Sequence, residues 1–118
     1  MKPSRPVYLN LLAIRQPLPA LVSIGHRLSG VLLFLGIPIL LLTLRSLLTG
    51  TGELLATPLF RFSLFLVLAA YAFHFFAGLR FLLLDLHWGV DLKRARRASQ
   101  LVIVAALISM ALLGIWLW

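Results

Sequence analysis

Residues 18–48 read LPALVSIGHRLSGVLLFLGIPILLLTLRSLL, an apolar stretch that is long enough to cross a membrane as one helix. About 20 apolar residues suffice for a bilayer core of roughly 30 Å. Two similar stretches follow, from about Leu59 to Leu86 and from about Ala98 to Trp118. Because 62% of the 118 residues are hydrophobic, too little polar surface remains to cover a soluble core. The sequence predicts an all-α membrane protein with three transmembrane helices in a single anchor domain, residues 1–118.

Prolines lie at two kinds of position in the first span. Pro17 and Pro19 lie where the span should begin, and a missing amide donor costs little there. Pro38 lies inside the span, where a proline removes a helical hydrogen bond. We therefore expect a helix that starts near Pro19 and is kinked at Pro38.

Basic residues predict how the chain crosses the membrane. They precede the first span and fill the link between the second and third spans, at Lys2, Arg5, Arg15, Lys93, Arg94, Arg96 and Arg97. The link from Ser46 to Phe60 contains no lysine or arginine. Because positive residues favour the cytoplasmic side, we expect the N-terminus in the cytoplasm and the C-terminus on the outer side.

Charge and cysteine content exclude several classes of function. The formal net charge is +8, but the basic residues gather at span ends and not on one solvated face, so no nucleic-acid partner is expected. The chain has no cysteine, which excludes disulfides and ligation of an iron–sulfur cluster by this chain. Residues 1–16 lack the apolar core and cleavage site of a secretory signal. Any redox centre must use histidine or belong to a partner.

Arg27 lies inside the first span. Placing a charged side chain at membrane depth has a free-energy cost of about 2.5–3.5 kcal/mol. Helical spacing places Ser23, Arg27, Gly30 and Phe34 on one face, with His26 beside them. Arg27 lies roughly 12 Å along the helix from its start. Its side chain could donate a hydrogen bond to a carbonyl oxygen or to an anionic group at that depth. Alternatively, its side chain extends to the membrane surface while Ser23 bonds a carbonyl of its own helix. Spacing alone leaves both open.

His74 is the second unusual residue, roughly 17 Å along the helix from Asp85 and so close to the bilayer midplane. A midplane histidine can relay protons, hydrogen-bond another helix or ligate haem iron. Gly78 and Ala70, four residues away on either side, leave its helix face bare. That face suits a flat macrocycle, and equally suits tight helix packing.

Charged residues near the cytoplasmic end of the second span suggest further contacts. Arg80 lies about two thirds of a turn from the His74 face and could pair with haem propionates, lipid phosphates or Asp85. The basic run at 93–97 is typical of an orientation signal that also attracts anionic membrane lipid. His87, next to Trp88, is expected at the interface and not as a ligand.

Together these motifs resemble the family of cytochrome b556 subunits of succinate dehydrogenase, the larger membrane anchors of respiratory complex II. The resemblance covers almost the whole chain. It rests on Arg5-Pro6, on Ser23 with the block from His26 to Gly30, and on His74-x-x-x-Gly78-Leu79-Arg80 followed by Asp85. Many relatives have histidine where this chain has Phe81, so a polar contact of the family is missing at that position.

The resemblance implies two sites in a bacterial inner-membrane complex. Ser23 and Arg27 would hold an oxygen of a quinone substrate, ubiquinone or menaquinone. His74 would be an axial ligand of haem b, with His26, Gly78 and Arg80 also contacting the haem. The haem would be shared with a second small anchor subunit that supplies the other histidine. Electrons from succinate would arrive through flavoprotein and iron–sulfur subunits, so the isolated chain would have no catalytic residues of its own.

Other functions compete with this interpretation. The chain could anchor a quinol:fumarate reductase, which runs the reaction in the opposite direction. A small proton-coupled transporter usually needs an acid deep in the membrane, but Glu53, Asp85 and Asp91 lie in links or at span ends. A cofactor-free assembly protein would leave Arg27 and His74 satisfied by helix partners.

Overall fold

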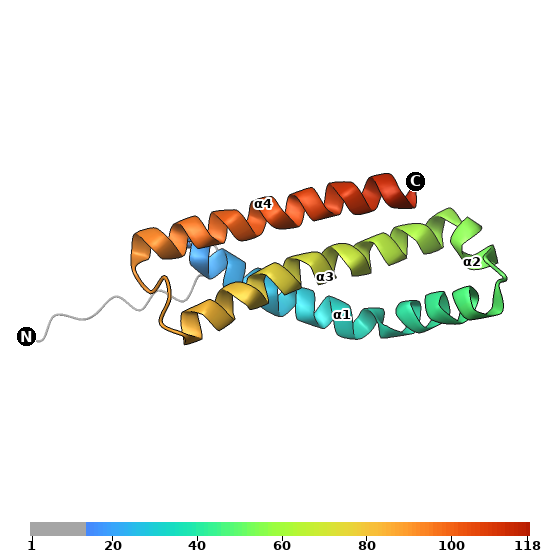
Figure 1. Cartoon of the computed structure of the whole chain (residues 1–118), viewed down its shortest axis with the longest axis horizontal. Helices are drawn as coiled ribbons and strands as arrows, with labels where there is room; N and C mark the ends of the chain where they lie inside the picture. The colour runs from blue at the N-terminus through green and yellow to red at the C-terminus, as the bar shows by residue number, and fades with distance from the viewer. Residues whose placement is uncertain (1–13) are drawn as a thin grey trace, which may run out of the picture.

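Three long helices form the described part of the chain. The computed structural model describes residues 14–118 and contains α1 (Leu18–Thr49), α3 (Pro58–Asp85) and α4 (Leu92–Leu117), with the short α2 (Glu53–Ala56) between α1 and α3. Figure 1 shows that successive long helices run in opposite directions. Each of the three is long and apolar enough to cross a membrane, which confirms the predicted fold class. Lys2, Arg5 and the Arg5-Pro6 motif lie outside the described residues.

The ends of α1 and α3 agree closely with the sequence prediction. Pro17 directly precedes α1 and Pro19 lies in its first turn, while α3 begins at Pro58. Prolines are tolerated at these positions because the first amides of a helix have no partner within it. Gly50 ends α1 in the left-handed conformation with φ 65°, which a glycine adopts without steric cost.

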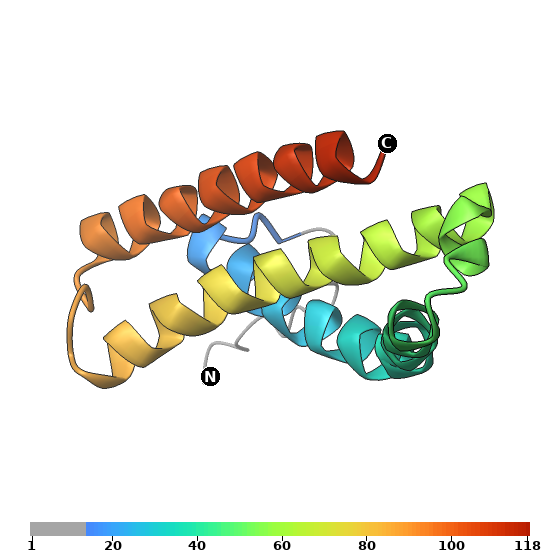
Figure 2. The ribbon, with the colours of Figure 1, turned by 45° about the vertical axis from the view of Figure 1, so that its right-hand side comes forward.

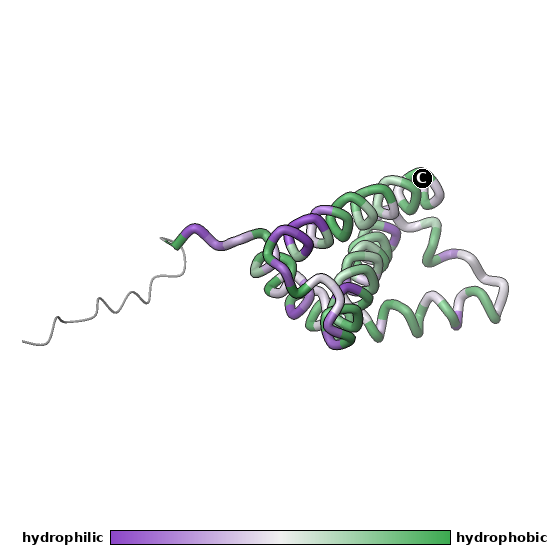
Figure 3. The backbone as a smooth tube through the Cα atoms, turned by 60° about the vertical axis from the view of Figure 1, so that its left-hand side comes forward, coloured by the Kyte–Doolittle hydropathy of each residue, from purple (hydrophilic) through white to green (hydrophobic). Residues whose placement is uncertain are grey.

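The third long helix begins earlier than predicted. The sequence places its start near Ala98, but α4 begins at Leu92, so the basic run at 93–97 is helical and is not part of the link. Lysine, arginine and alanine have high helix propensity, and long basic side chains can extend from a helix into the polar interface. Figure 3 shows this hydrophilic stretch on the first turns of α4. The remaining link turns through left-handed residues at His87 and Gly89.

Pro38 bends α1 without ending it. The helix is continuous from Leu18 to Thr49 with Pro38 in its interior. Figure 2 shows a clear change of direction in the second half of α1, in line with the predicted kink. The two parts of α1 can therefore lie at different angles to α3.

Small residues line the contacts between the helices. Three glycines of α1 lie against α3, where added Cβ atoms would approach the side chains of Phe73, His74 and Val67. The members of this set are Gly25, Gly30 and Gly36. Large apolar side chains instead cover the outside, as expected for a surface in contact with lipid. Close backbone approach is therefore what packs this bundle, as is common in membranes.

The tightest of these contacts predicts a stability effect. A Cβ atom at Gly36 would lie 2.6 Å and 2.8 Å from the two γ carbons of Val67. Valine has a stiff side chain, so Gly36→Ala must push the helices apart and should cost about 1–3 kcal/mol. We expect a lower midpoint of thermal unfolding in detergent and recovery in Gly36→Ala/Val67→Ala. Gly114→Ala is the control, because its Cβ would lie 3.8 Å from Phe65. An unchanged midpoint for Gly36→Ala would show that the close approach is unnecessary.

Candidate functional site

His26 of α1 and His74 of α3 stack face to face between the two helices. Their ring centroids are 4.0 Å apart and their planes differ by 14°. Each ring lies over a glycine of the opposite helix. A Cβ at Gly30 would be 3.2 Å from Cε1 of His74, and a Cβ at Gly78 would be 3.4 Å from Nε2 of His26. The two antiparallel helices thus make reciprocal histidine–glycine contacts.

Hydrogen bonds fix the orientation of the His74 ring. Nδ1 of His74 lies 3.0 Å from the carbonyl oxygen of His26 and 3.1 Å from Oγ of Ser29. The Ser29 hydroxyl donates to the same His26 carbonyl at 2.9 Å. A carbonyl oxygen can only accept, so Nδ1 of His74 carries the proton and donates it. In the neutral ring Nε2 then has a free lone pair, and it has no hydrogen-bond partner within residues 14–118.

Ser23 and Arg27 lie one turn apart on α1 beside the histidine pair. Arg27 is exposed and Ser23 is half-buried, and neither forms a hydrogen bond or ion pair with any residue from 14 to 118. Ser29, Thr43 and Ser99, by contrast, bond carbonyls of their own helices. The alternative in which Ser23 bonds its own helix is therefore not observed. Both side chains keep donors available for a group other than residues 14–118.

Arg80 differs from Arg27 because it is buried. Only 6% of its surface is exposed, and its Nε has no hydrogen-bond partner among the described residues. The guanidinium carbon lies 5.4 Å from the ring centroid of Phe81, which is itself 5.1 Å from the His26 ring. Phe81 is thus close to both Arg80 and His26. Within residues 14–118, Arg80 forms no ion pair with Asp85, which is one of the three partners that the sequence suggests.

The bare helix face predicted next to His74 is occupied in the structure. The imidazole of His26 covers Gly78, so that glycine provides space for a side chain of the neighbouring helix. Ala70 is buried within the bundle. Tyr71 is exposed and lies near Phe75, with 6.3 Å between ring centroids. Phe81 contacts the histidine pair, with 5.1 Å between the centroids of its ring and the His26 ring.

Comparison with known proteins identifies the family. Residues 1–113 match the succinate dehydrogenase/fumarate reductase transmembrane subunit family. The chain is also 34% identical, over 126 residues and 100% of both chains, to the succinate dehydrogenase cytochrome b556 subunit of Coxiella burnetii. This chain belongs to the succinate dehydrogenase/fumarate reductase transmembrane subunit family. It is therefore a multi-pass anchor subunit of a bacterial inner membrane, in agreement with its three apolar helices.

Two contacts of this family member were not foreseen from its sequence. The roles of Gly30 and of the Ser29 hydroxyl toward His74 are visible only in the folded chain. A signal was present, since the spacing His-x-x-x-Gly occurs twice, at His26 with Gly30 and at His74 with Gly78. Two antiparallel helices with this same spacing can pair each histidine with the opposite glycine.

Proposed function

We propose that this anchor subunit binds haem b through His74 and a quinone through Ser23 and Arg27, so that electrons from succinate reduce the quinone. The observation that supports this most directly is the 3.0 Å contact of His74 Nδ1 with the carbonyl oxygen of His26. Metal-bound histidines commonly donate their other ring N–H to a carbonyl, which fixes the tautomer and the ring orientation. The printed name of the Coxiella relative, a cytochrome b556 subunit, also implies haem b.

His74 is proposed as the ligand that this chain supplies to haem b. When bound, haem b would supply a one-electron redox centre. His74 would hold the iron with Nε2 while its Nδ1 stays bonded to the His26 carbonyl. His26 is not proposed as a second ligand, because its ring stacks face to face on that of His74. The second axial histidine is therefore proposed to come from a second, small anchor subunit.

The remaining haem contacts are proposed for His26, Gly78 and Arg80. His26 packs on His74 and would contact the haem beside that ligand. Gly78 would contribute by leaving space for the His26 ring. A propionate contact of Arg80 stays a prediction, since Phe81 is the ring that both Arg80 and His26 approach.

The quinone contact is proposed for Arg27 and Ser23. An exposed guanidinium and a free hydroxyl one turn apart can donate to the same quinone oxygen. Negative charge grows on that oxygen during reduction, and a nearby cation stabilises it strongly where water is scarce. Arg27 is exposed and Ser23 is half-buried, so the pocket would be completed by partner subunits.

The partners proposed for this chain are a flavoprotein, an iron–sulfur subunit and the second anchor. This chain has no cysteine for an iron–sulfur cluster, so those centres must belong to other subunits. Operation toward fumarate is the alternative direction of the same assembly. The family match covers transmembrane subunits of both succinate dehydrogenase and fumarate reductase.

Removal of the proposed haem ligand gives the first functional prediction. His74→Leu should abolish the haem b absorbance bands of the purified complex, since no other nitrogen takes this position. His87→Asn is the control, because His87 lies in the link with φ 61° and asparagine tolerates that conformation. Reduced-minus-oxidised spectra measure both variants. A normal spectrum with stoichiometric haem in His74→Leu would assign the ligand role to another residue.

Removal of the Arg27 charge tests the quinone site separately. Arg27→Leu should lower succinate-driven quinone reduction by at least about tenfold, because a charge-assisted hydrogen bond contributes about 1.5–3 kcal/mol. Succinate oxidation with a water-soluble acceptor should remain. Arg45→Leu removes an equal charge from the other end of α1 and should leave both activities unchanged. The quinone assignment fails if Arg27→Leu turns over quinone at the rate of the wild type.

A further inference from the structure

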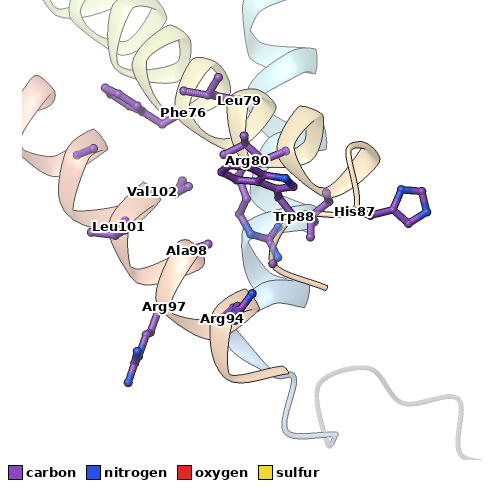
Figure 4. Close-up of a pocket in the computed structure, with 14 residues that line it drawn as sticks. Phe76, Leu79, Arg80, His87, Trp88, Arg94, Arg97, Ala98, Leu101 and Val102 are labelled. Atoms are coloured by element: carbon purple, nitrogen blue, oxygen red, sulfur yellow. The ribbon is translucent and has the colours of Figure 1, made fainter. Parts of the chain in front are cut away.

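A pocket of about 870 Å³ lies between the last turns of α3 and the first half of α4. Its walls are mainly apolar, with Phe76, Leu79, Leu101 and Val102 among the lining side chains, and none of its lining residues is acidic. Figure 4 shows the pocket between the two helices, with Trp88 at its mouth. The stacked histidines and the proposed quinone residues do not line it. It is a separate feature of the subunit.

Two arginines from different helices converge in this pocket. Arg80 reaches in from α3 and Arg94 from α4, and Figure 4 shows the two side chains directed toward each other. Only 6% of the surface of Arg80 is exposed, and its Nε has no hydrogen-bond partner within residues 14–118. A buried cation without a partner is costly. Arg94 is exposed, and an anion held beside it would offset the cost of burying Arg80.

Other groups at the same end of the pocket also favour an anion. Arg97 also lines the pocket, although Figure 4 shows its side chain directed away from Arg80 and Arg94. The helix α4 begins here, and the side chain of Asp91 does not cap its first amides. Free amides at the N-terminus of a long helix attract negative groups. The positive charge is therefore confined to one end of an otherwise apolar cavity.

We infer that this pocket binds an anionic phospholipid, with the phosphate between Arg80 and Arg94 and one acyl chain along the apolar wall. Arg80 lies five residues before the end of α3 at Asp85, about 8 Å along the helix, which is a suitable depth for a headgroup phosphate. Basic pockets between transmembrane helices on the cytoplasmic side commonly bind such headgroups. The apolar wall distinguishes a lipid from a free phosphate, which would leave this surface empty. The inference does not depend on the quinone role, and it shares only Arg80 with the proposed haem contacts.

Two pairs of basic residues on α4 provide a matched test. Arg94 and Arg97 line the pocket, whereas Lys93 and Arg96 on the same turns do not. The purified complex in mild detergent is exposed to phosphatidylglycerol or phosphatidylcholine, and retained lipid is counted by native mass spectrometry. We expect the wild type to retain phosphatidylglycerol in preference to phosphatidylcholine. Arg94→Gln/Arg97→Gln should retain phosphatidylglycerol about twenty-five-fold more weakly, at about fivefold for each charge removed. Lys93→Gln/Arg96→Gln should retain lipid as the wild type does.

A second pair of variants tests the acyl chain without changing charge. Ala105 lines the pocket and Ala111 lies exposed further along α4. Ala105→Phe should fill the apolar wall and release the lipid, while Ala111→Phe should not. Full retention by Ala105→Phe, with displacement by inorganic phosphate alone, would indicate a free-phosphate site and overturn the inference.

The haem spectrum separates this inference from the propionate prediction. Arg80→Gln should release the lipid if its guanidinium holds a phosphate, and the haem bands of the same variant report separately on the proposed propionate contact. Loss of haem with full lipid retention in Arg80→Gln would assign this arginine to a propionate and overturn the inference. Equal loss of lipid from the Lys93/Arg96 and Arg94/Arg97 variants would likewise overturn it, by showing only general attraction to a basic surface.

Discussion

The face-to-face contact of His26 with His74 is the interaction on which the arrangement of α1 and α3 depends. Each ring occupies the space that a side chain at Gly78 or Gly30 would fill. The helices can therefore come close enough for Nδ1 of His74 to donate to a backbone carbonyl of α1. Rotation or sliding of either helix would break both contacts together, so the stacked pair sets the register of the interface.

The three spans could be predicted from the sequence because apolar length is a local property. The start of α4 was misplaced because hydropathy marks where a chain is apolar and not where its helix begins, and the basic run is helical as well. The histidine stack was not predicted, since the meeting of His26 with His74 depends on the rotation of two helices about their axes. The His-x-x-x-Gly spacing in each helix could be seen in the sequence. That spacing does not show which side chain of the other helix will lie against it.

Two arginines within the spans also show that the sequence alone does not tell where a side chain lies in the folded bundle. The cost of a charge in an apolar span draws attention equally to Arg27 and Arg80. Only the folded chain shows that Arg27 is exposed beside Ser23, whereas Arg80 is buried beside α4. The sequence suggested three partners for Arg80. Because no ion pair with Asp85 is present among the described residues, haem propionates and lipid phosphates remain. Burial and direction thus assign two similar residues to different faces of the subunit.

The hydrogen-bond acceptor of His74 belongs to α1, while the ring itself belongs to α3. A stronger bond at Nδ1 makes Nε2 more basic, and a more basic ligand favours ferric over ferrous iron. Helix tilt responds to the thickness of the surrounding bilayer, and a change of tilt alters the distance between a donor and an acceptor on different helices. With haem iron held on Nε2 as proposed, its midpoint potential would therefore vary with membrane thickness.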